Sequence, residues 1–221
     1  MVAAAGERAA AGCGGVILLV SKAHGTLVRV RDRQDPVVRG HLGRLLHPLD
    51  GSRVQDSLDA GFPVAADNRA FVGFEEDKFR ALLVRVAGMP LLFVTAPDVV
   101  GDAAATDALW REWAPVIAAH GLRAAYVAQD GYREAPADAG AVFIGGSTEF
   151  KLGPVGERAA RDAKDRGLWL HVGRVNTMRR LSYCKTIGAD SVDGTQWSMF
   201  TDTYIAGGLA ACTMGAQARL C

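Results

Sequence analysis

The feature that most constrains the fold is a regular alternation, after Gly88, of short apolar runs with stretches of helical periodicity. Such alternation is typical of successive βα units that build a parallel sheet. The strand candidates are 90–95, 123–128, 141–144, 168–172 and 190–192, with further candidates at 62–65 and within 16–30. An open, doubly wound sheet is the alternative, but seven or eight candidates favour a compact or incomplete (β/α)8 TIM-type barrel, although about 250 residues is more usual for a full one.

The intervening segments carry apolar residues at helical spacing and end on glycine, a common helix stop. Pro154 can begin a helix that Gly167 ends. The other expected helix faces are Leu109, Trp113 and Ile117; Met178, Leu181 and Ile187; and Phe79, Leu82, Leu83 and Val86. Because no repeat or long linker interrupts this pattern, we predict a single barrel domain over residues 15–221. The small residues of 1–14 do not have the layout of a targeting segment and are predicted to be a flexible tail.

Composition narrows the function classes. Hydrophobic residues make up 49% of the chain and charged residues 22%, which is typical of a globular protein and excludes a disordered one. The net charge of +1 provides no general argument for a polyanionic partner, although a local basic face remains open. The longest apolar run, 15–20, is far shorter than the roughly 20 residues of a membrane span. We therefore expect a cytoplasmic protein without membrane contact.

Four scattered cysteines, Cys13, Cys184, Cys212 and Cys221, form neither a disulfide framework nor a zinc motif. We expect reduced thiols, no metal site and no redox cofactor.

A small polar cluster follows each strand candidate in the second part of the chain and one earlier strand. These clusters are 66–68, 96–98, 128–131, 145–148, 173–176 and 192–194. The strands of a parallel barrel all point the same way, so the clusters should converge on its C-terminal mouth, where barrel enzymes keep their chemistry. One such cluster alone is ordinary turn chemistry, but six at matching positions favour a functional site.

Three strand-end carboxylates, Asp67, Asp98 and Asp193, belong to that set. Two carboxylates facing one glycosidic carbon are what double displacement at a sugar requires: one attacks the anomeric carbon, and the other protonates the leaving group. A further carboxylate, the Gln129 amide and the backbone N–H groups of 145–146 suit the hydrogen-bonding edge of a purine-like base.

The order and spacing of these residues resemble the tRNA-guanine transglycosylase superfamily. The matching segments, within roughly residues 43 to 197, are 67–68, Asp98, 127–129, 143–146, 171–173 and 188–193. More narrowly, the chain is similar to short queuine tRNA-ribosyltransferase-like forms from actinobacterial phages and their hosts that place 7-deazaguanine bases in DNA. The resemblance implies that Asp193 attacks the ribose anomeric carbon and that Asp67 is the general acid/base. It implies base-binding roles for Asn68, Asp98, Gln129, Gly145, Gly146 and Gly173.

Two departures from the family matter. The family's zinc site of three cysteines and a histidine is absent, because no histidine follows Cys212 or Cys221. The zinc-bearing subdomain that helps to hold tRNA is therefore missing, which favours DNA as the substrate. The resemblance also implies glycine after the Asp-Asn pair, where this chain has Arg69. That side chain could narrow the pocket, reach a phosphate or leave the protein inactive.

The most basic stretch is 164–185. Its expected phosphate contacts are Arg174, Arg179 and Arg180, whereas Lys164 and Arg166 are interpreted as a solvated helix face. A nucleotide in a barrel mouth must be flipped out of its helix, and backbone cations would help to hold it there. His171, within an apolar run, is interpreted as a core or pocket-wall residue. Lys151 could form a Schiff base in an aldolase-type barrel, but nothing in the sequence marks it as desolvated.

These observations predict a base-exchange glycosyltransferase, a pentosyltransferase that replaces guanine in DNA with a free 7-deazaguanine base. The alternatives are the same exchange on tRNA and a non-catalytic nucleic-acid-binding barrel. A homodimer, or a partner protein that opens the duplex, is compatible with the sequence, and a phage-encoded protein would work in the host cytoplasm.

Overall fold

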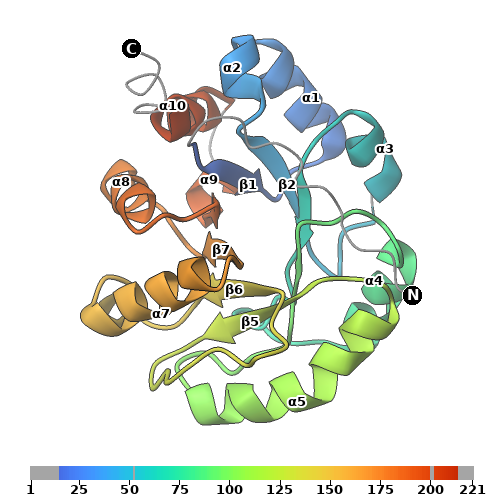
Figure 1. Ribbon diagram of the computed structural model, residues 1–221. Coiled ribbons are helices and arrows are strands. Elements are labelled where there is room, and N and C mark those ends of the chain that lie inside the picture. Colours follow the sequence, from blue (N-terminus) through green and yellow to red (C-terminus); the bar gives the residue numbers. More distant parts are fainter. Residues whose placement is uncertain (1–14, 52, 200–201, 214–221) are drawn as a thin grey trace.

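The computed structural model describes residues 15–51, 53–199 and 202–213, so the expected tail of 1–14 lies outside the described residues. Eight parallel strands form a closed barrel in chain order, with β8 paired to β1 (Figure 1). The strands are β1 (Ile17–Val20), β2 (Leu42–Leu46), β3 (Val64–Ala66), β4 (Val94–Thr95), β5 (Ala124–Ala128), β6 (Ala141–Ile144), β7 (Trp169–Val172) and β8 (Ser191–Asp193). The predicted TIM-type barrel is confirmed in its compact form.

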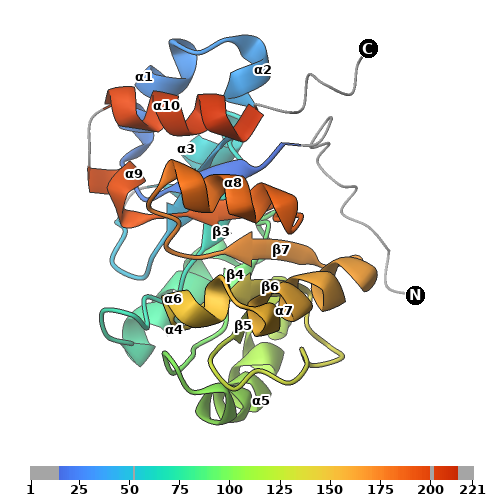
Figure 2. The same cartoon turned by 90° about the vertical axis from the view of Figure 1, so that its left-hand side faces the viewer.

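Helices surround the barrel. They are α1 (His24–Asp32), α2 (Pro36–Arg39), α3 (Val54–Asp59), α4 (Glu76–Val86), α5 (Ala103–Ala119), α6 (Thr148–Lys151), α7 (Pro154–Asp165), α8 (Met178–Thr186), α9 (Thr195–Met199) and α10 (Asp202–Thr213). The predicted amphipathic faces are found on α4 and α5, and Pro154 begins α7. On α8 the prediction holds only for Leu181: Met178 is 42% exposed, Ile187 follows the end of the helix, and Cys184 is the second buried residue. The chain passes from β5 to β6 through 129–140 without a helix, so this barrel is built from fewer residues than one with a helix after every strand. After β8, α10 packs beside α2 and α8 and completes the ring (Figure 1 and Figure 2).

In the described segments, none of the helices combines the length and apolar character needed to cross a bilayer.

Side chains alternate along each strand between the barrel interior and the surrounding helices. The inward-facing apolar residues form their own buried cluster: Ile17, Leu19, Leu45, Ala65, Phe93, Ala125 and Ala141. Outward-facing residues such as Leu18, Leu42 and Val192 join the larger core beneath the helices. Asp67 and Asp193 each lie two residues after an inward position, so this alternation directs both toward the C-terminal mouth.

The N-terminal third contains a strand that the sequence did not reveal, because β2 was not among the strand candidates. The candidate within 16–30 is β1, and α1 begins in the remainder of that segment. The β2 sequence hides its strand character because Gly43 and Arg44 interrupt its apolar residues. A Cβ at Gly43 would lie 2.6 Å from a Leu19 side-chain carbon and 2.8 Å from the Pro63 carbonyl oxygen, so crowding inside the barrel favours glycine there.

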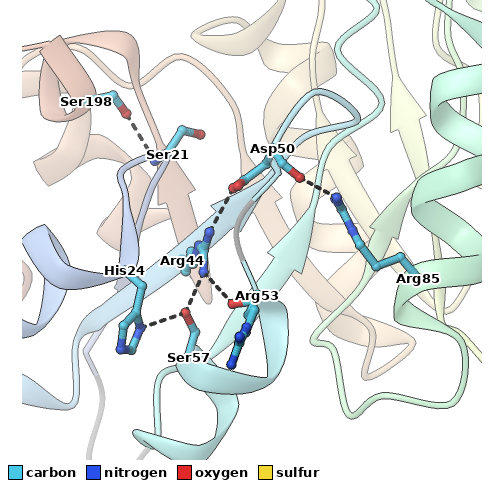
Figure 3. A network of polar contacts seen from close by, with 8 residues as sticks. All are labelled: Ser21, His24, Arg44, Asp50, Arg53, Ser57, Arg85 and Ser198. Carbon is cyan, nitrogen blue, oxygen red and sulfur yellow. Dashed lines mark hydrogen bonds and ion pairs between the residues drawn. The ribbon is translucent and has the colours of Figure 1, made fainter.

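Arg44 is fully buried on the outer side of β2, where polar partners surround its guanidinium (Figure 3). Its Nη1 donates to Ser57 Oγ of α3 at 2.7 Å and to the Arg53 carbonyl at 3.3 Å, and its Nη2 donates to Asp50 Oδ2 at 2.9 Å. Arg85 of α4 donates to the Asp50 carbonyl. A buried charge is tolerated only with such partners, so this network ties β2 to α3 and α4.

Candidate active site

The C-terminal mouth of the barrel contains a cavity of about 70 Å³ that opens to solvent. Its lining residues come from the ends of β3 to β8: Asp67, Asn68, Phe71, Thr95, Asp98, Val100, Val127, Gln129, Phe143, Gly145, Gly146, Arg174 and Asp193. The structure therefore brings together eight of the eleven residues predicted for the site. The other three, Gly173, Arg179 and Arg180, lie outside this lining.

Asp193, the last residue of β8, is held by two N–H donors at one carboxylate oxygen. His171 Nε2 lies 3.0 Å from its Oδ1, and the backbone N–H of Arg174 lies 3.2 Å from the same atom. Among the described residues, Oδ2 of Asp193 accepts no hydrogen bond. The side chain is 20% exposed, so one carboxylate oxygen remains available toward the cavity.

Asp67 lies in the opposite kind of environment. Burial raises the pKa of its carboxyl to about 7, and the charges of Asp193 and Asp98 act in the same direction. The backbone N–H groups of Asn68 and Arg69 oppose this rise without cancelling it. Near neutral pH, Asp67 is therefore a carboxyl that can both donate and accept a proton.

Asp98 is oriented by two side-chain amides. Asn68 Nδ2 donates to its Oδ1 at 2.7 Å and also to the Ala96 carbonyl at 2.6 Å, while Gln129 Nε2 donates to its Oδ2. Burial raises the pKa of Asp98 despite these donors and the charge of Arg174. Asn68 and Gln129 thus hold the carboxyl that faces the cavity.

The amide oxygens of these two residues are also used within the protein. Asn68 Oδ1 accepts the Ala70 N–H at 2.6 Å, and Gln129 Oε1 accepts the Gly101 N–H at 3.0 Å. Both N–H bonds of Asn68 are occupied as well. The geometry therefore assigns Asn68 and Gln129 to the support of Asp98 and of the loop after β4 more than to direct contact with a ligand.

The glycine pair after β6 contributes unequally. The N–H of Gly145 donates to the Ala128 carbonyl at 3.0 Å as part of the barrel, so it is not available to a ligand. The N–H of Gly146 makes no hydrogen bond within the described part of the chain. A Cβ on Gly146 would lie 2.6 Å from Asp130 Oδ2, and φ is +67° there, so this position favours glycine. At this side of the cavity, one backbone N–H group is available to a ligand instead of the two that the sequence led us to expect.

Gly173 lies behind Asp193 and outside the lining of the cavity. A Cβ there would lie 2.5 Å from the Phe143 ring and 3.4 Å from Asp193 Oδ1. Glycine at this position lets the ring and the carboxylate approach the backbone closely, which places Gly173 in the wall that supports the site.

Two arginines at the mouth adopt positive φ, 66° at Arg69 and 58° at Arg174, and no other described non-glycine residue does so. Backbone strain of this kind concentrates at functional sites. Arg174 places its guanidinium 4.2 Å from the centroid of the Phe71 ring and donates to the Gly146 carbonyl. Arg69 pairs with Glu75 at 3.3 Å and is not part of the cavity lining, so its long side chain does not narrow the pocket.

The remaining predicted phosphate contacts lie apart from the mouth cavity. Arg179 and Arg180 line a groove beside α8 together with Leu152, Thr177 and Tyr183. Arg180 Nη2 also lies 3.4 Å from Thr148 Oγ1 of α6.

Nothing in the sequence marks Lys151 as desolvated, but the structure shows that its side chain is buried. It is 5% exposed, and burial, together with the charge of Arg174, lowers its pKa to about 8. Its Nζ donates to the Gly173 carbonyl at 3.3 Å and does not line the mouth cavity. This geometry supports the loop after β7 and does not place the amine against a ligand in the mouth.

Sequence reasoning missed the apolar and hydroxyl parts of the lining: Phe71, Thr95, Val100, Val127 and Phe143. The inward alternation of β4, β5 and β6 could have found Thr95, Val127 and Phe143. Thr95 Oγ1 is buried and has no hydrogen-bond partner among the described residues, so it is available to a ligand. Phe71 is 64% exposed and lies on a loop, where no sequence periodicity marks it.

No family model and no curated protein matches this chain. Among solved structures, it is similar to a mutant tryptophan synthase alpha-subunit from Pyrococcus furiosus, with 12% identity, a TM-score of 0.53 and coverage of 90% of this chain and 98% of that chain. It is also similar to CdNal from Clostridium difficile in complex with mannosamine, with 11% identity, a TM-score of 0.53 and coverage of 90% and 74%. At such identities the likeness shows the barrel fold alone.

Proposed function

We propose that this protein is a base-exchange glycosyltransferase that replaces guanine in DNA with a 7-deazaguanine base through a covalent aspartyl intermediate. The observation that carries the proposal is one cavity whose three carboxyls include two, Asp67 and Asp193, in different environments. With a pKa of about 7, Asp67 is present in both its protonated and its ionised form near neutral pH, while Asp193 receives two N–H donors and keeps one oxygen free. Double displacement at a sugar carbon needs one carboxylic acid and one nucleophilic carboxylate.

The steps follow from this difference. Asp193 Oδ2 forms a bond to C1′ while the bond from C1′ to N9 of guanine breaks, and the electron pair leaves with the base. Asp67 gives its proton to the departing guanine and becomes a carboxylate. The incoming 7-deazaguanine gives its ring N–H proton to Asp67, attacks C1′ through that nitrogen and releases Asp193. No proton or electron is gained or lost over the cycle, so no further reactant is required.

The rest of the cavity suits a planar purine-like base. The Asp98 carboxyl can accept from N–H donors on the base edge, while the Gly146 N–H can donate to its carbonyl oxygen. The unpartnered hydroxyl of Thr95 adds one more polar contact. The exposed ring of Phe71 provides a flat surface of the kind on which bases stack.

The proposed polynucleotide substrate is argued from the cations at and beside the mouth. Arg174 at the mouth and the groove of Arg179 and Arg180 offer cations along one path for a phosphate backbone. The same exchange on tRNA, and binding of nucleic acid without catalysis, are the alternatives.

The test is exchange of labelled guanine, and then of 7-deazaguanine bases, into matched duplex DNA and tRNA. We expect wild type to label DNA and to form a covalent protein–DNA adduct that survives denaturation. Asp193→Asn should form no adduct and still bind DNA. Asp107→Asn is the matched control, because that carboxylate of α5 accepts from the Tyr126 hydroxyl and does not line the cavity.

The outcomes separate the alternatives. Label in tRNA alone would keep the mechanism and change the substrate. Nucleic-acid binding without label in either polymer would favour the non-catalytic barrel. Full exchange by Asp193→Asn would refute the assignment of the nucleophile.

A further inference from the structure

A polar column runs through the otherwise apolar interior of the barrel. The inward positions of β7 and β8 are Trp169, His171, Ser191 and Asp193, and His171 pairs with Ser191 in the strand register. His171 and Ser191 are both fully buried. Burying polar groups inside a barrel is unfavourable unless each one is hydrogen-bonded, so the arrangement of this column calls for a physical reason.

Its hydrogen bonds run in one direction. Trp169 Nε1 lies 2.9 Å from Ser191 Oγ, Ser191 Oγ lies 2.9 Å from His171 Nδ1, and His171 Nε2 lies 3.0 Å from Asp193 Oδ1. An indole N–H can only donate, so Ser191 accepts from Trp169 and is left with its own proton for His171 Nδ1. The remaining ring proton of a neutral His171 is then on Nε2.

The other neutral tautomer of His171, with its proton on Nδ1, is disfavoured by the contact with Asp193. It would place the lone pair of His171 Nε2 against a lone pair of the Asp193 carboxylate. The His171 ring is also held from its sides, because the centroids of Phe143 and Phe93 lie 4.5 Å and 5.1 Å from its own. Ring position and tautomer are thus both determined by the barrel interior.

We propose that His171 is a positioning residue that fixes the rotamer of Asp193 through its Nε2–H, and that Ser191 and Trp169 fix the tautomer that makes this possible. The inference deepens the proposed function and rests on it, since Asp193 is the nucleophile there. With Oδ1 held by His171 and by the Arg174 N–H, it is Oδ2 that points to the reacting carbon. Outer partners that orient metal-binding side chains contribute about 10- to 100-fold to activity, and we expect an effect of the same order for the partner that orients Asp193.

The first experiment reads the tautomer by nitrogen-15 NMR of labelled histidine, in the absence of any substrate. His171→Gln identifies the signal. We expect the Nε2–H tautomer in wild type and a mixture of tautomers in Ser191→Ala, which removes one oxygen and leaves the packing intact. Trp169→Phe should shift the population in the same direction. An Nδ1–H tautomer in wild type would overturn the inference.

The second experiment measures exchange. Glutamine can accept from Ser191 through Oε1 and donate to Asp193 through Nε2, so His171→Gln should retain most of the activity. His171→Leu should lower kcat about 10- to 100-fold with little change in KM. His120→Leu, on a histidine at the end of α5 outside the mouth, is the matched control. If His171→Leu does not fold, the comparison of Ser191→Ala with wild type replaces it, with a loss of kcat again expected.

Failure of this inference and failure of the proposed function are distinguishable. Wild-type protein without exchange activity refutes the function, while the tautomer measurement still decides the hydrogen-bonded column. An active wild type in which His171→Gln and His171→Leu lose equal activity, or neither loses any, overturns the positioning role of His171.

Discussion

Removing the charge of Asp67 should stabilise the protein, and increasingly so as the pH rises. Its carboxyl has an ordinary pKa of 3.8 and a pKa of about 7 in the fold. At about 1.4 kcal/mol for each pKa unit, ionising Asp67 disfavours folding by about 4 kcal/mol. Because the mouth admits water and ions on one side, we expect a measured effect of about 2–4 kcal/mol. Asp67→Asn keeps the shape of the side chain and removes this penalty.

The sign follows from proton binding. Between pH 3.8 and about 7 the folded protein holds a proton on Asp67 that the unfolded chain has lost, so the stability of wild type falls as the pH rises through this window. The stability that the Asp67 proton contributes is fully present below pH 3.8 and fully lost well above pH 7. Urea unfolding of wild type and Asp67→Asn, followed by tryptophan fluorescence at several pH values between 5 and 8.5, should show the variant gaining relative stability up to about pH 8.

Asp130 provides the control, because its carboxyl has a lowered pKa in the fold where that of Asp67 is raised. Burial raises the pKa of Asp130, but the hydroxyl and N–H of Ser147 outweigh it and lower that pKa below its ordinary value. Asp130→Asn should therefore destabilise the protein near neutral pH, and less so as the pH falls toward the acid range. A difference between wild type and Asp67→Asn that does not change with pH would refute the reasoning about Asp67.

Three further results are expected. Gly146→Ala places a Cβ 2.6 Å from Asp130 Oδ2 at a φ of +67°, so it should destabilise by at least about 1–2 kcal/mol in urea unfolding, whereas no loss would mean that the loop relaxes freely. Arg44→Met removes a fully buried cation from Asp50 and should destabilise by about 3–5 kcal/mol, which thermal unfolding would detect. Exchange activity should decline above about pH 7 as Asp67 loses its proton, and a flat profile to pH 9 would exclude it as the acid.

The fold could largely be predicted from periodicity. The apolar faces of α4 and α5 and the strands of the second half carry clear patterns because each element buries a single face or a continuous run. β2 escaped because Arg44 breaks its apolar run, and the buried charge is stable only through partners such as Ser57 and Asp50 that lie elsewhere in the chain. A sequence pattern contains no information about such partners.

The location of the site was also predictable, because parallel strands bring their C-terminal ends to one mouth. The contacts that individual side chains make in the site could not be predicted from the sequence. Asn68 and Gln129 have the chemistry to bind a base, yet their amides hold Asp98. Lys151 follows a turn that looks exposed and is nevertheless buried against the Gly173 carbonyl. These outcomes depend on the direction of side chains after the barrel closes.

The unfavourable features of this protein gather at one end of the barrel. A carboxyl that resists ionisation at Asp67 and two arginines at positive φ, Arg69 and Arg174, all lie at the mouth. The opposite layers of the interior are mostly apolar, and the polar groups of His171 and Ser191 within them are hydrogen-bonded. Because a folded chain keeps such strain only where the surrounding structure enforces it, the stable lower barrel supports a mouth whose groups are held away from their preferred states. The raised pKa of Asp67 thus reduces stability at neutral pH and, at the same pH, keeps a proton ready for transfer.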